Sequence, residues 1–233
     1  MWSSSRERPE RSSPVWSRAG QSRGGRRDTR LVVRRSEHEA GGQLESYKPA
    51  NAGKVNKGWI DGDSTLFGYS ASAVGVIYNT TVVSELNADW VELADAKYKD
   101  MTAIPDPKKS GACKDFLAGL VTGLDKGEAI MQSWAANGLT VPGANRAALE
   151  AVTTGEKGIL IAGVDYNAYS AMAKGEPLKI YYPASGTVVN PRPAMILKTA
   201  PNMDNAKAFV DFLFSDEARS SWQTPICCRA AAT

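Results

Sequence analysis

Histidine and cysteine are scarce in this chain, and their scarcity excludes several classes of protein. The 233 residues hold one histidine, His38, and three cysteines, at positions 113, 227 and 228. Zinc sites and disulfide frameworks need such residues in larger numbers at short, regular spacing. A serine or cysteine nucleophile needs a neighbouring base, most often histidine. We therefore expect no metal site of this kind and no enzyme, and we expect Cys113 to be a buried apolar residue of a helix.

Cofactor fingerprints and long apolar runs are missing as well. The lone glycines do not form the Gly-rich loops that bind dinucleotides or nucleotide phosphates, so no cofactor is expected. No apolar run approaches the ~20 residues that a membrane-spanning helix requires. With 42% hydrophobic and 23% charged residues, the composition is typical of a globular protein.

An excess of one charge is also absent over most of the chain. The net charge is +3, but residues 1–43 carry ten arginines, no lysine and five acidic residues, so the remaining chain is mildly acidic. Because the basic charge belongs to this head alone, nucleic acid is not an expected partner.

Both ends of the sequence differ from its middle. Residues 1–43 are rich in Ser, Arg and Gly and lack a helical or strand period, which predicts a disordered or non-native head, for example one read from another frame. An RNA-binding or membrane-surface arm is the alternative. The head has no apolar core of the kind that a secretory signal peptide contains. Residues 216–233 are predicted to be an irregular or non-native tail.

Between these ends, short apolar strands alternate with amphipathic helices. Strands are predicted at 67–78, 101–104, 158–162, 178–182 and 194–198, and helices at 111–120, 127–137, 145–154, 165–174 and 204–214. This alternation predicts an α/β architecture with largely parallel strands.

The stretch Met101–Leu120 is the most informative part of the chain. A short strand ends at Pro105, a turn follows, and a helix begins at Ser110–Gly111. The Ser110 hydroxyl and the N–H groups of Gly111 and Ala112 could hold an anion, because the first N–H groups of a helix lack intrahelical partners. The alternative is that Ser110 only caps the helix.

Several motifs in order resemble one family. They are W-x-x-L-x-x-x-x-Y-K from Trp90, I-P-D-P-K-x-S-G at 104–111, G-E-K-G-I at 155–159, K-G-E-P-L at 174–178, Y-P-x-x-G-T-V at 182–188, and A-P-N-x-x-x-A-K-A-F-V-D-F-L at 200–213. Over residues 44–216 the chain resembles the extracytoplasmic solute-binding proteins of bacterial ABC importers, in the branch that binds iron(III), phosphate esters and 2-aminoethylphosphonate.

The resemblance implies a type II periplasmic-binding-protein-like fold with one near-complete α/β lobe and a remnant of the second. Residues 44–81 would hold the remnant of lobe 1 and a crossing strand, 82–178 lobe 2, and 179–215 the return crossing and a lobe 1 helix. Residues 179–189 would carry the chain back between the lobes. Exposed strand edges of the remnant would lower the stability of the chain.

The resemblance also implies a function. The chain would be the substrate-binding component of an ABC importer, a monomer in the periplasm or outside the cell. It would capture a small anionic solute, a phosphonate or phosphate ester, between its lobes and deliver it to membrane permease subunits. The expected ligand-binding residues are Ser110, Gly111, Ala112, Tyr69, Ser70, Asp165 and Tyr166. Tyr69 and Ser70 could instead pack between the lobes, and Asp165 could cap its helix.

Two alternatives stay open. Iron binders of this family use adjacent tyrosines, whereas Tyr166 and Tyr169 are separated here, and the adjacent Tyr181 and Tyr182 lie in a strand whose side chains alternate. An iron(III) receptor that uses tyrosines and a synergistic anion is therefore the first alternative. A truncated product without function is the second.

Overall fold

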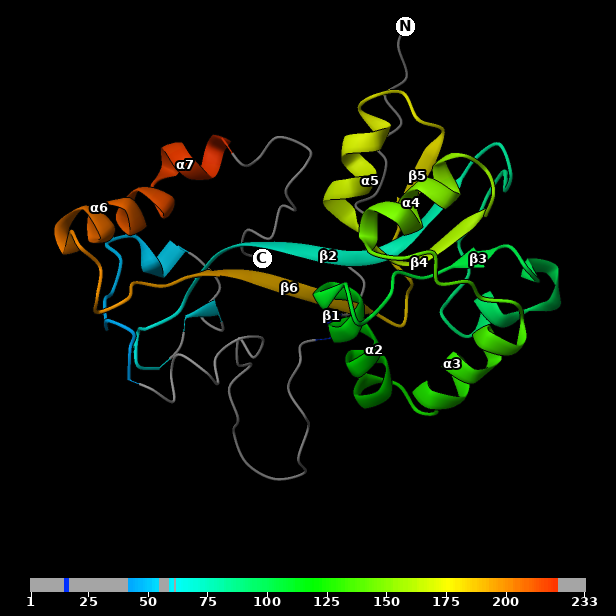
Figure 1. Cartoon of the computed structure of the whole chain (residues 1–233), viewed down its shortest axis with the longest axis horizontal. Coiled ribbons are helices and arrows are strands. Elements are labelled where there is room, and N and C mark those ends of the chain that lie inside the picture. The colour runs from blue at the N-terminus through cyan, green and yellow to red at the C-terminus, as the bar shows by residue number, and fades with distance from the viewer. Residues whose placement is uncertain (1–14, 17–41, 55–58, 61, 222–233) are drawn as a thin grey trace, which may run out of the picture.

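The computed structural model describes residues 15–16, 42–54, 59–60 and 62–221. Figure 1 shows a larger body with β3, β4, β5 and α2–α5, and a smaller body with α6, α7 and the segment before β2. The two bodies are joined by the long strands β2 and β6, whose paired stretch we call the ribbon. In the described part of the chain, no helix has both the length and the apolar character to cross a membrane.

The strands are β1 (Val15–Trp16), β2 (Phe67–Asn79), β3 (Thr102–Ala103), β4 (Ile159–Val164), β5 (Leu178–Tyr181) and β6 (Thr187–Ala194). The helices are α2 (Gly111–Gly123), α3 (Gly127–Ala136), α4 (Asn145–Thr153), α5 (Asp165–Met172), α6 (Met203–Leu213) and α7 (Asp216–Ser221). Short 3-10 turns lie at 52–54, 92–94 and 96–98.

The sheet is built around β2, in the order β1-β6-β2-β4-β3, with β5 also paired to β2. β2 runs antiparallel to β4, β5 and β6, and of the described pairs only β1–β6 and β3–β4 are parallel. The prediction of largely parallel pairing was therefore wrong. β4 and β5 are joined by α5 and run in the same direction, as the alternation predicted, but the oppositely directed β2 lies between them.

The return crossing was also misplaced in the sequence. Residues 178–181 form β5, which stays in the larger body, and the chain crosses back through β6 at Thr187–Ala194 rather than at 179–189. The separate strand predicted at 194–198 shares only Ala194 with β6. Pro191 and Pro193 made residues 189–193 an improbable strand, because proline lacks the N–H that a strand donates. In the structure they lie opposite Ala71 and Gly68 of β2, with no strand described on their other side.

The predicted irregular tail begins too early. Residues Asp216–Ser221 form α7, and Ala218 is buried, so the ordered chain continues beyond Ser215. The Ser215 hydroxyl accepts a hydrogen bond from the Ala218 N–H at 3.1 Å, which is the contact of an N-cap. The rest of the predicted tail lies outside the described residues.

Helices cover both faces of the larger body's sheet. α2 and α3 bury Phe116, Leu120 and Trp134 against Val74 and Ile161. On the opposite face, α4 and α5 pack against Ile77, Leu160 and Leu178. The alternation of β2, with Val74 and Val76 on one side and Ile77 on the other, is what gives the sheet two apolar faces.

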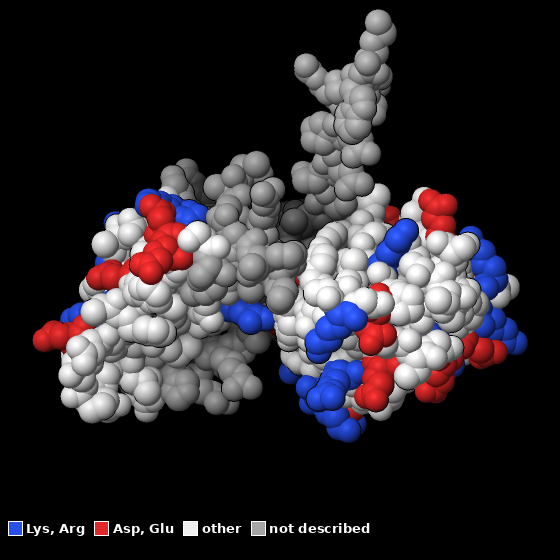
Figure 2. Space-filling view, turned by 90° about the horizontal axis from the view of Figure 1, so that it is seen from above, with Lys and Arg blue, Asp and Glu red and all other residues white. Residues whose placement is uncertain are grey.

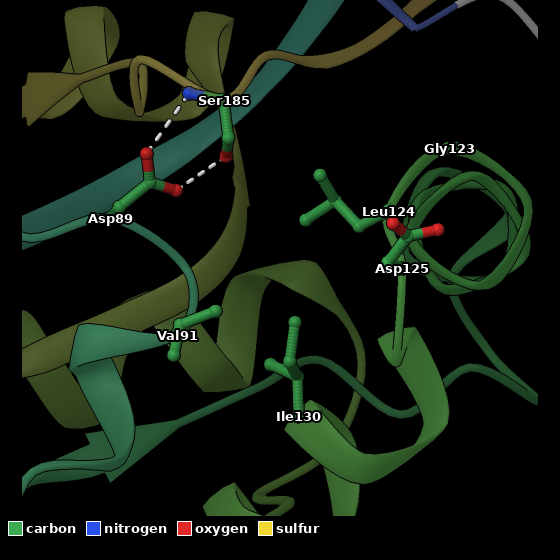
Figure 3. A pocket seen from close by; sticks show the side chains of 7 residues that line it. All are labelled: Asp89, Val91, Gly123, Leu124, Asp125, Ile130 and Ser185. Carbon is green, nitrogen blue, oxygen red and sulfur yellow. Dashed lines mark hydrogen bonds between the residues drawn. The ribbon is translucent and has the colours of Figure 1, made fainter.

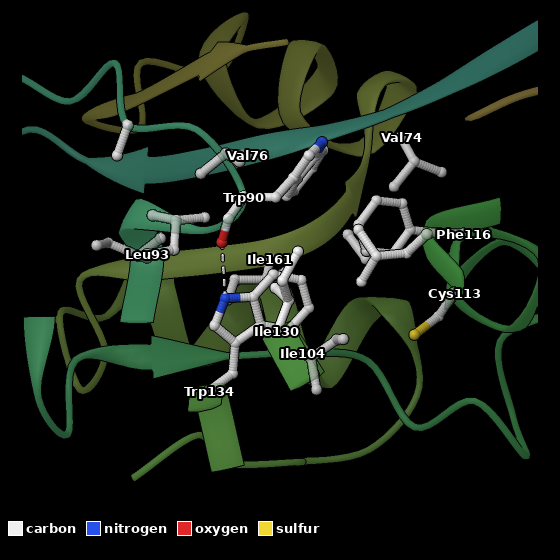
Figure 4. Packing of buried hydrophobic residues seen from close by; sticks show 14 of the residues in the cluster. Val74, Val76, Trp90, Leu93, Ile104, Cys113, Phe116, Ile130, Trp134 and Ile161 are labelled. Atoms are coloured by element: carbon white, nitrogen blue, oxygen red, sulfur yellow. Dashed lines mark hydrogen bonds between the residues drawn. The ribbon is translucent and has the colours of Figure 1, made fainter. Parts of the chain in front are cut away.

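An aromatic cluster holds the α2–α3 face together (Figure 4). The rings of Trp90 and Phe116 lie 4.6 Å apart, and those of Phe116 and Trp134 lie 6.5 Å apart and nearly parallel. Each indole N–H has an acceptor: Trp134 Nε1 donates to the Trp90 carbonyl at 2.9 Å, and Trp90 Nε1 to the Gly186 carbonyl at 2.7 Å. The large rings are therefore buried without an unsatisfied donor.

The smaller body has a core of its own. Phe67, at the outer end of β2, packs with residues of the segment after β6 and of α6, namely Ile196, Val210, Leu213 and Phe214. Tyr47 fixes the segment before β2 to α6, because its hydroxyl donates to Asp211 Oδ2 at 2.6 Å.

The aromatic cluster gives a test of the larger body's stability. Phe116 is fully buried and packs against two indoles, so Phe116→Ala should lower the free energy of unfolding by ~3–5 kcal/mol. Val91 is 59% exposed, and Val91→Ala should change it by less than ~0.5 kcal/mol. Urea unfolding followed by tryptophan fluorescence measures both. A loss below ~1 kcal/mol for Phe116→Ala would contradict the packing described here.

Candidate ligand site in the ribbon between the two bodies

A row of polar side chains runs along one face of the ribbon. Ser70 lies opposite Arg192 and Ser72 opposite Asn190, and directly opposed residues of antiparallel strands share a face. We call these four residues the polar row. Toward the larger body the row continues as Val74 and Val188, which belong to the core that α2 covers. This face of the strand pair is therefore apolar inside the larger body and polar outside it, along the polar row.

Asp165 closes the sheet at the point where β4 ends. It is 1% exposed, and its Oδ2 accepts the Ala73 N–H of β2 at 2.9 Å. Val164, the residue before Asp165, is the last residue of β4 that pairs with β2. The Asp165 carboxylate therefore accepts the Ala73 N–H in place of the backbone carbonyl that a longer β4 would provide. Its Oδ1 accepts the Tyr166 N–H at 2.7 Å. Asp165 thus fixes the start of α5 against the ribbon, and its predicted contact with a ligand stays a prediction.

Arg192 was not among the residues expected from the sequence. Its guanidinium carbon lies 4.7 Å from the centre of the Tyr166 ring, so the polar row of β6 reaches the first turn of α5. Both side chains are partly buried. The signal in the sequence was weak. Residues 44–233 contain four arginines, and of those that the structure describes, only Arg192 falls in a strand, between two prolines.

Ser110 occupies the N-cap position of α2, as one interpretation of the sequence predicted. It is 3% exposed, and its hydroxyl accepts the Cys113 N–H at 3.1 Å. Gly111 is exposed, and a Cβ added there would meet no atom within 4 Å. The helix therefore opens into free space at Gly111, while the Ser110 hydroxyl has a structural role.

Lysines 108 and 109 next to this helix start are exposed surface residues. Lys109 Nζ lies 3.9 Å from Asp106 Oδ2, and Asp106 Oδ1 accepts the Lys108 N–H at 2.9 Å. The Asp106 carboxylate therefore offsets part of their positive charge near Gly111. Figure 2 shows acidic and basic side chains interspersed on the visible face, without an extended patch of one sign.

The structure brings some of the predicted residues together and separates others. Ser70 and Tyr166 both adjoin Arg192, the first across the strand pair and the second through its ring. Tyr69, the next residue, packs partly buried against the core of the smaller body. In Figure 1, α2 and α5 begin on opposite sides of the ribbon, so Ser110–Ala112 and Tyr166 approach it from different layers.

Tyrosines meet at a second place, near the end of β5. The hydroxyls of Tyr169 in α5 and Tyr182 lie 3.4 Å apart. Tyr181 points elsewhere and donates to the Ala88 carbonyl at 2.9 Å, which agrees with the expected alternation of the adjacent pair. Within the described residues, no group of three or more His, Cys, Asp or Glu side chains could hold a metal ion.

One surface pocket of about 510 Å³ lies away from the ribbon, at the far end of α2 (Figure 3). It is lined by Asp89, Val91, Gly123, Leu124, Asp125, Ile130 and Ser185. The Asp89 carboxylate accepts hydrogen bonds from the backbone N–H and the hydroxyl of Ser185. Two carboxylates and apolar side chains do not suit an anion, and none of the predicted site residues lines this pocket.

Solved structures with this arrangement of elements are type II periplasmic binding proteins. Ferric ion-binding protein A of Pasteurella haemolytica has a TM-score of 0.70 at 20% identity, and the match covers 85% of this chain and 67% of that one. The periplasmic binding protein AfuA of Actinobacillus pleuropneumoniae, solved with fructose 6-phosphate, has a TM-score of 0.66 at 25% identity, over 83% and 64% of the two chains. The predicted fold class is confirmed.

The sequence places the chain more narrowly. Residues 35–225 match the bacterial extracellular solute-binding protein family, and the chain belongs to it. The family serves ABC importers and consists of binding proteins rather than enzymes, which confirms the resemblance drawn from the motifs.

Curated relatives differ in what their names say they bind. Iron uptake protein A1 of Synechocystis sp. is 29% identical over 174 residues, which are 68% of this chain and 48% of that protein. A Salmonella typhimurium protein, named as a 2-aminoethylphosphonate-binding periplasmic protein, is 28% identical over 168 residues, which are 64% of this chain and 48% of that protein. The chain spans about half the length of these relatives.

The role of Asp165 can be tested by removing its charge. Hydrogen bonds to charged groups stabilise more than neutral ones, so Asp165→Asn should lower the free energy of unfolding by ~1–3 kcal/mol. Asp63 is exposed, and Asp63→Asn should have almost no effect. Chemical denaturation measures both. If Asp165 instead holds a ligand's ammonium group, its variant will keep its stability and lose binding.

The thiol at the start of α2 gives a chemical test. Burial, with a smaller contribution from the Asp106 carboxylate, raises the pKa of Cys113 from 9.0 to about 12. At a pH of about 8 its thiolate fraction is then on the order of 10³-fold below that of an ordinary cysteine. Native protein treated with iodoacetamide should remain unmodified at Cys113, and protein unfolded in urea should react. Rapid native alkylation, located by peptide mass spectrometry, would show that this corner opens.

Proposed function

We propose that this chain is the solute-binding component of an ABC importer and captures a small organic anion, a phosphonate or a phosphate ester, between its two bodies. The observation that carries the proposal is the polar row on the ribbon. A strand pair that only joined two bodies would be stable with apolar side chains on this face, because partly buried polar groups need partners. Here serine, asparagine and arginine side chains line one face of the ribbon, and the Arg192 guanidinium reaches the start of α5.

The two helix starts supply further donors. Gly111 and Ala112 lie in the first turn of α2, where N–H groups lack carbonyl partners and carry the positive end of the helix dipole. Tyr69 and Tyr166 would wall the ligand on the sides of the two bodies. Contacts from both bodies would favour a closed form, and this form would be presented to membrane permease subunits. The protein would act as a monomer outside the cytoplasmic membrane.

Iron(III) is the second candidate cargo. It is favoured by the convergence of Tyr169 and Tyr182, since phenolate oxygens are hard donors that suit this ion. Against it, the Tyr166 ring already lies under a guanidinium. A visible charge-transfer band on addition of ferric citrate would support this candidate, and a colourless protein would count against it.

A thermal-shift and calorimetry series tests the proposal. 2-Aminoethylphosphonate, fructose 6-phosphate and inorganic phosphate are each titrated, and at least one should raise the Tm by several degrees at about 100 times its Kd, where binding stabilises by ~2.7 kcal/mol. If none of these anions raises the Tm or gives a heat of binding, the proposed function is wrong.

Glycine variants then locate the contact. Gly111→Ala adds a methyl group that no protein atom opposes, so it should preserve the fold and weaken binding about tenfold or more if ligand oxygens approach the backbone there. A methyl group added at Gly53 also meets no atom within 4 Å, and Gly53→Ala is the matched control. Equal affinity of the two variants would remove the α2 start from the site.

A further inference from the structure

Among the described residues, Arg192 is a cation without a counter-charge. The ion pairs in this part of the chain are formed by Lys54, Lys97, Lys109 and Lys207, and none involves Arg192. Its described contact is the face of the Tyr166 ring. A partly buried guanidinium is unfavourable without an anion, and stacking on a tyrosine offsets only a part of this cost.

A second group in the polar row also lacks a partner. The Asn190 Nδ2 is buried and has no hydrogen-bond acceptor within the described structure. Asn190 precedes Arg192 by two residues in β6, so both side chains leave the strand on the same face. Within the described part of the chain, an arginine without a counter-ion and an amide donor without an acceptor therefore lie next to each other on this face.

The chemistry of these neighbours indicates one kind of ligand. Ser70 and Ser72, across the strand pair, add hydroxyl groups, and the polar row contains no carboxylate. Guanidinium can donate two parallel hydrogen bonds to one oxyanion, and an amide can donate to another oxygen of the same group. The row thus offers donors to a group with several negatively charged oxygens.

We propose that Arg192 is the main contact of the solute's anionic group, with the Asn190 amide as a second donor, and that the Tyr166 ring holds the guanidinium in position. The proposal rests on the proposed function and specifies its site. It assigns the charge of the ligand to the ribbon itself rather than to the start of α2. It also assigns Tyr166 a positioning role through its ring, whereas from the sequence we expected Tyr166 to bind the ligand directly.

The test compares variants of the full chain, using the anion that binds the unmodified protein best among 2-aminoethylphosphonate, fructose 6-phosphate and phosphate. Arg192→Met should weaken binding on the order of 10- to 100-fold, the value of a charge-assisted contact. Arg192→Lys should lower the affinity about tenfold, because lysine keeps the charge but lacks the planar guanidinium with its two parallel donors. Arg146 is exposed on α4, and Arg146→Met, with the same change of charge, should bind normally.

Tyr166 variants separate its ring from its hydroxyl. Tyr166→Phe should retain the affinity within about threefold, because it keeps the stacking face, and Tyr166→Ala should lose about tenfold or more. Urea unfolding of each variant identifies losses that come from misfolding. Asn190→Ala removes the amide donor and should weaken binding without lowering the stability of the free protein, since this donor has no partner there.

The outcomes distinguish this inference from the function on which it rests. If the unmodified protein binds none of the anions, both fail. If it binds one and Arg192→Met binds that anion equally well, the inference is wrong and the function stands. If Tyr166→Phe lowers the affinity as much as Tyr166→Ala does, the Tyr166 hydroxyl contacts the ligand and the positioning role of the ring is wrong.

Discussion

The structure depends on the antiparallel pairing of β2, the strand that joins the two bodies together with β6. Its inner half lies between β4 and β5, and its outer half pairs with β6. Because the strand is continuous, any tilt of one body against the other must bend or twist the same ribbon. The side chains on the ribbon, and the groups packed against its ends, therefore determine both the relative position of the bodies and what can lie between them.

Asp165 shows how one residue links this pairing to a site. Its carboxylate ends the β2–β4 ladder and fixes the first turn of α5, which places the Tyr166 ring beneath the Arg192 guanidinium. Three elements that are distant in the sequence thus meet at one corner. The aromatic cluster under α2 anchors the helix whose first turn is open at Gly111.

The sequence predicted those features that local chemistry determines. The start of α2 was correct, because a turn, a capping hydroxyl and an apolar stripe occur together within Met101–Leu120. β2 was correct because its run of apolar and small residues leaves little alternative. β6 was misplaced because proline is unfavourable in most strands. Only the strand pairing shows that Pro191 and Pro193 lie at an edge of the sheet, where proline is tolerated. Arg192 was missed because its surroundings come from α5 and β2, and the acceptor role of Asp165 depends on Ala73, 92 positions away.

The prolines of β6 have a further consequence. The Ala73 N–H points to Asp165 and away from β6, so Ala73 and Val189 form a pair without mutual hydrogen bonds. Because this type of pair recurs at every second residue, Ala71 and Pro191 are such a pair too, and their backbone N–H and C=O positions face away from each other. Pro191 and Pro193, two residues apart, therefore both turn their backbone nitrogens to the outer side of the ribbon. An incoming strand would find no N–H there at two successive positions. The connection between the bodies is in this way a poor template for intermolecular β-pairing, although it is narrow and long.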